Sequence, residues 1–439
     1  MNSSSPRSRR WRRSAAVVAT LAAGALLAGC SGSSGGSSSR PENEIHVAVY
    51  GDATNKVEEA VVAKFNETSD VKAVLDVIPG ANYQQKLQTI IDTDSAPDVF
   101  FNWGGGSIKP FVDADLLLPL DDMIADDPKL EDAFLPSVFD TARFDEKAYG
   151  VPMRGTQPVM LFYNKSVLEA NGIAVPETWD DLMAAVETLK GAGVTPIALG
   201  GGDQWPTQMW FQYAYDRVAG PELFQSALDG DADAWASDDS KEALGMLRDL
   251  VDAGGFGTNF DSVKFTDGGS PALLRTGKAA FELMGSWEYS TQQNEDPEFA
   301  ATDLGYTTFP TVQGGKGDPA NLAGNTNNFY SVIKDTRYPD AVEDFLKIMY
   351  SDEFVQQQLA IGNLPTTTNT PDFLSTAADP AYSQYQFDLV EAAPSFQLSW
   401  DQAYPPAAMT PIHTAVAQFF SGTIDEDGFI SAMQALQAP

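Results

Sequence analysis

Hydrophobic and polar residues alternate with a period of two in residues 45–49 and 71–77, which predicts two strands. Each run is followed by a segment in which apolar residues recur at helical spacing, residues 55–65 and 83–91. A short apolar run at residues 97–101 then predicts a buried strand. Strands that alternate with helices in this way are typical of a mostly parallel sheet with helices on both faces.

A second block with the same alternation begins after residue 151. Its strands are predicted at residues 159–163, 196–199 and 279–284. Helical spacing of apolar residues is found at residues 178–189, 244–251 and 342–349. We therefore expect an α/β protein with two αβ blocks, in a chain long enough to form two sizeable cores.

Polar and aromatic residues follow two of the predicted strands at the points where the strands end. Asp52 comes after the first strand, and Asn102 and Trp103 come after the strand at residues 97–101. Ligands of open α/β sheets bind at the carboxyl ends of the strands. These loops are therefore the first candidate binding site.

Three tryptophans lie in loops, each with a carboxylate on the same turn or a nearby one. The pairs are Asp203 with Trp205, Trp287 with Glu288, and Trp400 with Asp401. Indole faces pack against the apolar faces of sugar rings, and carboxylates bind ring hydroxyls, so these pairs indicate a carbohydrate site. A site of this kind discriminates, because an unmatched buried polar group costs about 1–3 kcal/mol. The alternative for each tryptophan is a purely structural place in the core.

The composition excludes several classes of function. The formal net charge is −34, and an acidic surface repels nucleic acid and anionic lipid, so we expect neither as a partner. Cys30 is the single cysteine, so no disulfide is expected. His46 and His413 are the two histidines, which leaves no His/Cys cluster for a transition metal, and we expect no metal and no cofactor. A calcium site made of carboxylates stays open, although no EF-hand spacing is present.

The first 29 residues have the layout of a secretory signal, with arginines and no acidic residue, then an apolar run at residues 15–27. That run is too short to span a bilayer. The sequence Leu-Ala-Gly-Cys that ends at Cys30 resembles the lipobox of bacterial lipoprotein precursors, which implies that Cys30 is acylated and becomes the new N-terminus. A twin-arginine signal is the alternative, and Arg12 disfavours it. Residues 30–43, rich in glycine and serine, are expected to form a flexible tether.

Five short motifs follow one another in the chain after Glu44. They are Ala-Pro-Asp-Val-Phe-Phe at 96–101, Gly-Val-Pro to Tyr-Asn-Lys at 150–165, Val-Pro-Glu-Thr-Trp-Asp-Asp-Leu at 175–182, Gly-Lys-Ala-Ala-Phe to Gly-Ser-Trp at 277–287, and Phe-Pro at 309–310. The motifs at 175–182 and 277–287 are each degenerate, but in this order, behind a lipobox, they are jointly quite specific. With these motifs the chain from Glu44 onward resembles the extracellular solute-binding proteins of bacterial ABC sugar importers, the family that includes maltose-binding protein.

The resemblance implies two αβ lobes of the type II periplasmic-binding-protein kind, joined by a hinge that the chain crosses three times, with the ligand in the interlobe cleft. The expected crossings are near residues 151–156, 309–312 and 363–367. The expected boundaries are 44–151 with 311–364 for the first lobe, and 152–310 with 365–439 for the second.

The resemblance also implies which residues contact the sugar. Trp287 and Trp400 match the tryptophans that stack on sugar rings in the family, and Trp205 matches by its place after the Gly-rich strand end. The opposing lobe is expected to contribute Tyr50, Asp52, Asn102 and Trp103. For Arg154 in the first crossing, and for Asn325 and Asn328 after the second, a binding role and a structural role both stay open.

The function that the resemblance implies is that of a non-enzymatic, monomeric receptor. It would bind a di- or oligosaccharide, close around it and deliver it to an ABC permease. Acylated Cys30 would hold it on the outer face of the cytoplasmic membrane, in a cell without an outer membrane. Residues 101–107 and 399–402 are similar to those of actinobacterial xylobiose-binding lipoproteins.

Two other classes of function are compatible with tryptophans beside carboxylates. A secreted glycoside hydrolase would need two carboxyl groups about 5–10 Å apart across a glycosidic bond, and no such pair stands out in the sequence. A surface adhesin would bind polymer without hinge closure.

Overall fold

The computed structural model describes residues 41–52, 54–80, 83–266 and 268–436. The signal sequence and Cys30 lie outside these residues. The folded unit extends from Asn43 to Pro439. Within its described residues no helix has both the length and the apolar character needed to span a membrane.

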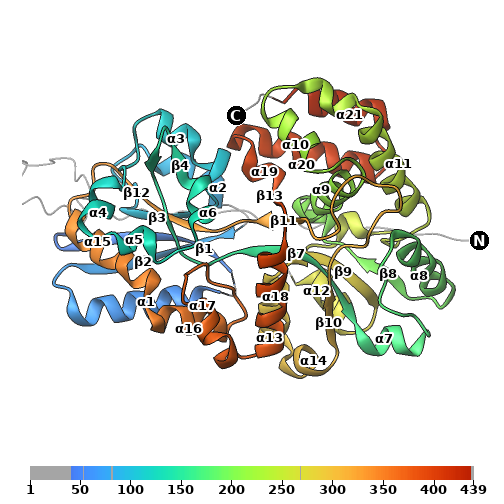
Figure 1. Cartoon of the computed structure of the whole chain (residues 1–439), viewed down its shortest axis with the longest axis horizontal. Helices are drawn as coiled ribbons and strands as arrows, with labels where there is room; N and C mark the ends of the chain where they lie inside the picture. Colours follow the sequence, from blue (N-terminus) through green and yellow to red (C-terminus); the bar gives the residue numbers. More distant parts are fainter. Residues whose placement is uncertain (1–40, 53, 81–82, 267, 437–439) are drawn as a thin grey trace, which may run out of the picture. The chain divides into compact units, whose positions relative to one another are not determined.

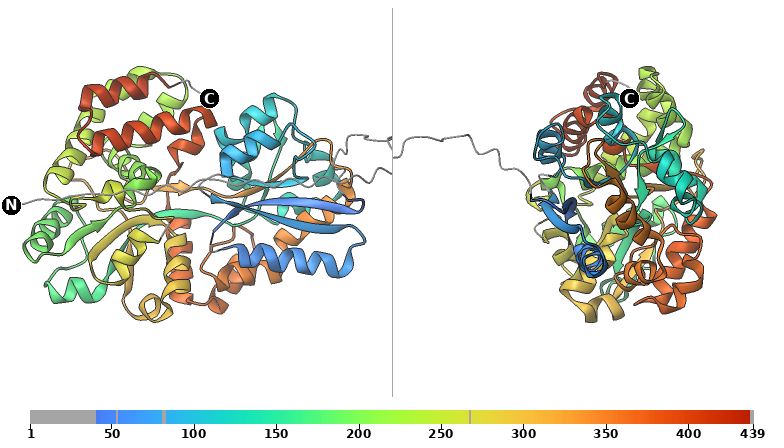
Figure 2. Two further views of the ribbon diagram at one scale, coloured as in Figure 1. Left: turned by 180° about the vertical axis from the view of Figure 1, so that it is seen from behind. Right: turned by 90° about the vertical axis from the view of Figure 1, so that its left-hand side faces the viewer.

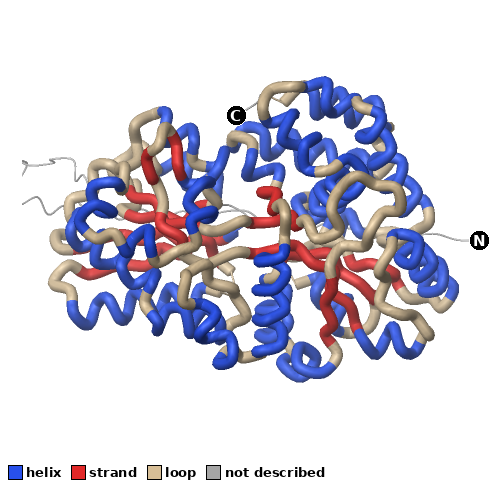
Figure 3. The backbone as a smooth tube through the Cα atoms, in the orientation of Figure 1, coloured by secondary structure: helices blue, strands red, loops and turns tan. Residues whose placement is uncertain are grey.

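The described residues form two large sheets, each with its own hydrophobic core, which confirms the expected two-lobe α/β fold. Figure 1 shows α1 and α3 on opposite sides of the first sheet, and Figure 3 shows the strands lying between helices. The strand order of the first sheet is β2 (Lys72–Pro79), β1 (Glu44–Gly51), β3 (Val99–Asn102), β12 (Phe329–Val332) and β6 (Val151–Pro152).

The second sheet is built around the long strand β7. The strand order is β13 (Phe396–Leu398), β11 (Leu322–Asn325), β7 (Gln157–Asn164), β9 (Ala279–Gly285) and β8 (Thr195–Ala198), and β10 (Leu304–Thr307) also pairs with β7. A two-stranded sheet of β4 (Arg143–Phe144) and β5 (Lys147–Ala148) lies apart from both.

Both sheets are mixed, which corrects the expectation of mostly parallel sheets. β1 pairs in parallel with β2 and β3, and β8 with β9, as alternating strands and helices require. However, β12 is antiparallel to β3 and β6, and β7 is antiparallel to β9, β10 and β11. The antiparallel pairs arise because the chain passes between the two sheets, so that strands enter each sheet from the other lobe.

The helices of the first lobe and of the hinge region are short, apart from the first one. They are α1 (Asn55–Thr68), α2 (Tyr83–Ile90), α3 (Lys109–Asp113), α4 (Asp121–Asp126), α5 (Lys129–Asp132), α6 (Pro136–Phe139), α15 (Pro339–Leu346), α16 (Asp352–Ala360) and α17 (Thr370–Phe373).

The helices of the second lobe form two groups, one on each side of its sheet (Figures 1 and 2). The upper group in Figure 1 consists of α9 (Trp205–Ala219), α10 (Pro221–Leu228), α11 (Asp238–Asp252), α19 (Trp400–Ala403), α20 (Pro406–Phe420) and α21 (Glu426–Gln434). The other helices are α7 (Lys165–Ala170), α8 (Trp179–Gly191), α12 (Gly269–Arg275), α13 (Trp287–Glu295), α14 (Pro297–Thr302) and α18 (Pro380–Ala392).

The helix α9 has no apolar stripe, which is why the hydrophobic pattern did not predict it. Every residue from Pro206 to Val218 is buried, because α9 packs against β9, β11, α11 and α20. A helix that is enclosed on all sides does not show the amphipathic spacing of a surface helix.

The chain passes between the two lobes through three segments that are hydrogen-bonded to one another. The first joins β6 to β7, the second joins β11 to β12 at residues 326–328, and the third joins α16 to α18. Met153 N donates to Asn328 O at 2.8 Å, and Thr156 N donates to Leu364 O at 3.0 Å. Asn327 Nδ2 donates to Thr366 Oγ1 at 2.8 Å. These bonds make the three passages one polar hinge.

The second passage lies later in the chain than the expected residues 309–312. Thr311 O accepts a hydrogen bond from Trp179 N at the start of α8, and the next strand, β11, still pairs with β7. Residues 311–325 therefore belong with the second sheet. The Phe-Pro motif at 309–310 carries no local signal of which sheet the following strand joins.

A glycine in the first passage is required by its surroundings. Gly155 has φ +88°, and a Cβ there would lie 1.9 Å from Leu364 O in the third passage. We predict that Gly155→Ala lowers the free energy of unfolding by clearly more than the roughly 1–2 kcal/mol that left-handed backbone costs a residue with a side chain. Denaturant unfolding followed by circular dichroism measures this change.

Gly172→Ala is the matched control, because Gly172 has φ +66° and no atom lies within 4 Å of the position that a Cβ would occupy there. This variant bears the backbone strain alone. Equal losses of stability in the two variants would show that the close approach of the hinge passages is not the constraint.

Candidate functional site

Two tryptophans meet because the strands that precede them are neighbours. β8 and β9 pair in parallel, so their carboxyl ends lie side by side, and each strand leads into a helix. Trp205 is the first residue of α9, and Trp287 is the first residue of α13. Their ring centroids are 6.0 Å apart at an interplanar angle of 56°, and both side chains are half-buried. The two rings form an angled aromatic surface.

The backbone around this aromatic pair is shaped to hold it. The ring of Trp287 lies over Gly285, where a Cβ would be 2.1 Å from the indole. Gln204, just before Trp205, has φ +66°, a conformation that residues with side chains rarely adopt. Asp203 accepts hydrogen bonds from Thr266 N at 2.8 Å and from Thr266 Oγ1, which ties this turn to the following loop.

The first lobe contributes a second aromatic group at the ends of β1 and β3. The Tyr50 ring lies 5.6 Å from that of Trp103, and Phe101 and Tyr83 pack against both. Tyr50 and Trp103 are half-buried, whereas Tyr83 and Phe101 are in the core. The two partly exposed rings therefore present an aromatic face supported from behind.

The loop after β3 contacts α19 of the second lobe. A Cβ on Gly106 would lie 2.4 Å from Ala403 O, and one on Gly105 would lie 2.7 Å from the Leu398 side chain. Glycines at these positions permit the close approach. The contact brings Asp401, on α19, to the edge of the site that carries Trp103.

The carboxylates of both lobes converge on Tyr50. Burial raises the pKa of the Tyr50 phenol above its usual range, and the charges of Asp52, Asp203 and Asp401 raise it further, while Arg154 opposes them. Because electrostatic influence declines with distance, these carboxylates lie in the neighbourhood of the phenol. The candidate site therefore combines aromatic and acidic residues of both lobes, and the region between these residues is called the cleft below.

Asp401 is held by two residues that sequence reasoning missed. Gln208 Nε2 donates to Asp401 Oδ1 at 2.6 Å, and His413 Nε2 lies 3.1 Å from Asp401 Oδ2. Gln208 lies three residues after Trp205 on α9, and this helical spacing is the signal that could have identified it. His413 is on α20 and has no such signal.

Arg154 is buried in the first hinge passage and joins three parts of the first lobe. Its Nε donates to Glu58 Oε1 and its Nη1 to Asp52 Oδ2, both at 2.6 Å, and its Nη2 donates to Tyr50 O at 3.0 Å. The guanidinium also lies 4.9 Å from the centre of the Phe101 ring. Arg154 therefore positions Tyr50 and Asp52. Its partner Glu58, on α1, was not predicted.

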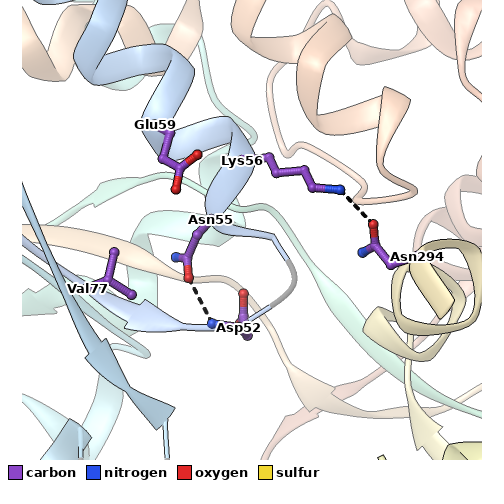
Figure 4. A pocket seen from close by; sticks show the side chains of 6 residues that line it. All are labelled: Asp52, Asn55, Lys56, Glu59, Val77 and Asn294. Atoms are coloured by element: carbon purple, nitrogen blue, oxygen red, sulfur yellow. Dashed lines mark hydrogen bonds between the residues drawn. The ribbon is translucent and has the colours of Figure 1, made fainter.

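A hollow of ≈ 460 Å³ opens beside Asp52 (Figure 4). Lys56 Nζ donates to Asn294 Oδ1 at 2.8 Å and so links α1 of the first lobe to α13 of the second. The hollow is lined by Asp52, Asn55, Lys56, Glu59, Val77 and Asn294.

The structure places Trp400 in the core, which differs from the expectation of a sugar-stacking ring. Its side chain is 0% exposed, stacks on Phe224 at 5.4 Å and packs against Trp235. The indole Nε1 donates to Gln397 Oε1 at 2.9 Å. Neither face of the ring is available to a ligand in this structure.

Three predicted amide residues are also internal. Asn102 is 2% exposed, donates to Ser331 and accepts from Gly104 N. Asn325 ends β11 and donates to Gln157, and Asn328 lies in the second hinge passage, where its carbonyl accepts from Met153. All three stabilise the loops and the hinge around the cleft.

Glu288 lies beneath the cleft, paired with another buried carboxyl group, that of Glu282 on β9. Both side chains are 0% exposed, and Gln292 donates to Glu288. Burial raises the pKa of Glu282 to about 8, and burial together with the charge of Glu282 raises the pKa of Glu288. Such a pair keeps at least one proton near neutral pH. With no exposed surface, it cannot flank a glycosidic bond as the acids of a hydrolase do.

Among the described residues no group of three or more His, Cys, Asp or Glu side chains is arranged to hold a metal ion.

Two mixed sheets joined by a three-passage hinge, with aromatic and acidic groups at the strand ends of both lobes, are typical of a two-lobe binding protein. A family model described as bacterial extracellular solute-binding protein matches residues 50–356. The chain belongs to this family, which confirms the resemblance found in the sequence.

Known relatives are similar over part of their length. An uncharacterized ABC transporter extracellular-binding protein of Pyrococcus horikoshii is 28% identical over 64% of this chain and 65% of its own length. A multiple sugar-binding protein of Streptococcus mutans is 25% identical over 51% of this chain and 52% of its own. The chain thus spans about half to two thirds of the length of these curated relatives.

Solved structures are similar to this chain over nearly all of their own length. One, from work on xylan utilization by the thermophilic bacterium Caldanaerobius polysaccharolyticus, has a TM-score of 0.81 at 28% identity and covers 89% of this chain and 99% of its own. A chitin oligosaccharide binding protein has a TM-score of 0.78 at 26% identity and covers 89% and 98%.

We predict that Arg154→Met lowers the free energy of unfolding by about 3–5 kcal/mol, because it leaves Glu58 buried without its cation. The double variant Arg154→Met/Glu58→Leu should recover much of this loss, since both charges are then removed. Denaturant unfolding measures both. Lys64→Met is the control, because it breaks an exposed pair with Glu353 and should leave stability unchanged. An equal loss in the single and double variants would contradict the assigned role.

The buried pair predicts a pH dependence of stability. A carboxyl group with a raised pKa keeps in the folded state a proton that the unfolded chain loses, so stability falls as pH rises from about 4.5 to about 8. The slope is about 1.4 kcal/mol per pH unit for one such proton. The double variant Glu282→Gln/Glu288→Gln should lack this fall in denaturant unfolding across that pH range. Glu187→Gln, on the exposed face of α8, is the control and should retain it.

Proposed function

We propose that this protein is an extracellular receptor that binds a di- or oligosaccharide in the interlobe cleft and delivers it to an ABC importer. The observation that carries the proposal is the partly exposed aromatic pair Trp205 and Trp287 at neighbouring strand ends of the second lobe, with a second partly exposed pair, Tyr50 and Trp103, at strand ends of the first lobe. Xylobiose or a related β-linked oligosaccharide is the ligand that we favour.

The chemistry of the cleft supports a carbohydrate ligand. Partly exposed indole rings offer flat apolar faces, and carboxylates beside them accept hydrogen bonds from ring hydroxyls. A sugar ring has both features, with apolar faces and an equatorial rim of hydroxyls. We propose as direct contacts the partly exposed residues Tyr50, Asp52, Trp103, Asp203, Trp205, Trp287 and Asp401.

The relatives support the same class of ligand. The relative from Streptococcus mutans is named a multiple sugar-binding protein. Of the structures more than 25% identical to this chain, one comes from work on xylan utilization and another is a chitin oligosaccharide binding protein. Both names concern β-linked polymers of sugar, which agrees with the ligand proposed from the sequence.

Lobe closure is the proposed mechanism of capture. The open protein would bind the sugar on one lobe, and the closed state would be favoured by as much as its additional contacts are worth. Contacts between lobes that could contribute are the Lys56–Asn294 hydrogen bond and the approach of Gly105 and Gly106 to α19. The closed form would then dock on the permease.

The anchoring proposed from the sequence completes this mechanism. Acylated Cys30 and the tether would hold the receptor as a monomer on the outer face of the cytoplasmic membrane, at a high effective concentration near its permease. Metabolic labelling with a fatty acid, compared between the natural chain and Cys30→Ser, tests the anchor. Labelling that persists in Cys30→Ser would exclude it.

A binding screen tests the class of function. The protein without its signal is titrated with xylobiose, cellobiose, maltose, chitobiose and their longer homologues while tryptophan fluorescence is recorded. A saturable change without hydrolysis products supports the receptor. Product formation would indicate a glycoside hydrolase, and a response to polymer alone would indicate an adhesin.

We predict that Trp205→Ala and Trp287→Ala each weaken binding of the best sugar by at least tenfold, because each removes one stacking surface. Titration calorimetry measures the affinity. Trp400→Phe is the matched control, since it retains an aromatic ring in the core and should leave affinity within about twofold while lowering stability. Unchanged affinity in both alanine variants would refute the proposed site.

A further inference from the structure

The cleft collects negative charge from three separate elements. Asp52 follows β1, Asp203 precedes α9, and Asp401 lies in α19, and all three act electrostatically on the phenol of Tyr50. Asp203 and Asp401 are held by neutral donors of Thr266 and Gln208. These two bonds orient the carboxylates without neutralising them, and His413 is the second partner of Asp401.

Each positive group that the structure describes at the cleft has a polar partner or a carboxylate close by. The guanidinium of Arg154 is 2% exposed and divides its donors between Asp52 and Glu58, so it offers little to a ligand. Lys56 donates to Asn294 at the hollow beside Asp52, where Glu59 also lies. The ring of His413 faces Asp401. The N-terminal ends of α9 and α13 favour negative charge. Each already has a carboxyl group, because Asp203 lies just before α9 and Glu288 lies in the first turn of α13.

A carboxylate on a ligand would therefore enter a site with like charges and no available guanidinium fork. A hydroxyl group meets no such penalty, because it donates to the carboxylates. An ammonium group is favoured by the carboxylates and by the faces of the tryptophan rings. The acidity of the whole chain, with a formal net charge of −34, acts in the same direction over longer range.

We infer that the cleft selects its sugar by charge: it accepts neutral and amine-bearing sugars and rejects those that carry a carboxylate. This inference rests on the proposed function and narrows its substrate class. Uronic acid units, which decorate many plant polysaccharides, would thus be excluded at the positions that contact Asp52, Asp203 and Asp401.

The test compares two ligands that differ in charge and hardly in shape. The disaccharide that binds best in the fluorescence screen is prepared with a terminal ring that carries either a carboxylate at C5 or the corresponding primary amide. Titration calorimetry at low salt should show the amide binding at least tenfold more tightly than the acid, which corresponds to a difference in binding free energy of about 1.4 kcal/mol. Raising the salt to about 0.5 M should narrow the ratio, because screening weakens the repulsion.

Charge variants locate the effect. Asp203→Asn/Asp401→Asn should reduce the ratio of amide to acid affinity toward one, whereas Asp252→Asn, at the exposed end of α11, should leave the ratio unchanged.

Equal binding of acid and amide would overturn the inference. The inference would also be overturned if neither the acid nor the amide bound while the unmodified disaccharide did, because the shape of the added group would then explain the rejection. If no sugar binds in the screen, the proposed function itself fails, and that result is distinct from either outcome.

Discussion

The buried guanidinium of Arg154 is the interaction on which the arrangement of the cleft depends. It lies in the passage between β6 and β7, yet its hydrogen bonds go to Glu58 on α1 and to Tyr50 and Asp52 at the end of β1. A buried cluster of charges is stable only while each member keeps its partners. Movement of the hinge is therefore coupled to the positions of Tyr50 and Asp52, which we propose as ligand contacts.

The second lobe reaches the same cleft through sheet topology. Parallel pairing of β8 with β9 places the starts of α9 and α13 side by side, which brings Trp205 against Trp287. Glycines after β3 let that loop approach α19, and α19 carries Asp401. The cleft thus combines residues at the ends of five strands, β1, β3, β8, β9 and β13, and its carboxylates Asp203 and Asp401 accept hydrogen bonds from the neutral donors of Thr266 and Gln208. Rigid elements hold each part, so the geometry does not depend on one long flexible loop.

The fold was predictable wherever the pattern of residues is local. The strands β1, β2, β3, β7, β8 and β9 and the amphipathic helices α1, α8 and α11 appear in the structure close to their predicted ranges. The helix α9 was missed because it is buried on all sides and has no polar face. The second hinge passage was placed too early, because pairing of β11 with β7 joins Gly324 to Pro158 and Asn325 to Gln157, which lie far apart in the sequence.

The candidate site shows the same division. From the chain alone one obtains the order of strands and helices, the solute-binding family and the tryptophan–carboxylate pairs in loops, because each is written in neighbouring residues. The exposure of each side chain cannot be obtained in this way, because it depends on which distant elements pack together. Trp205 and Trp287 stay partly exposed at adjacent strand ends, whereas Trp400 is enclosed by Phe224 and Trp235, and Glu288 is buried against Glu282. Packing between remote segments, which no local pattern encodes, decides which of these residues stay partly exposed and which are buried beneath them.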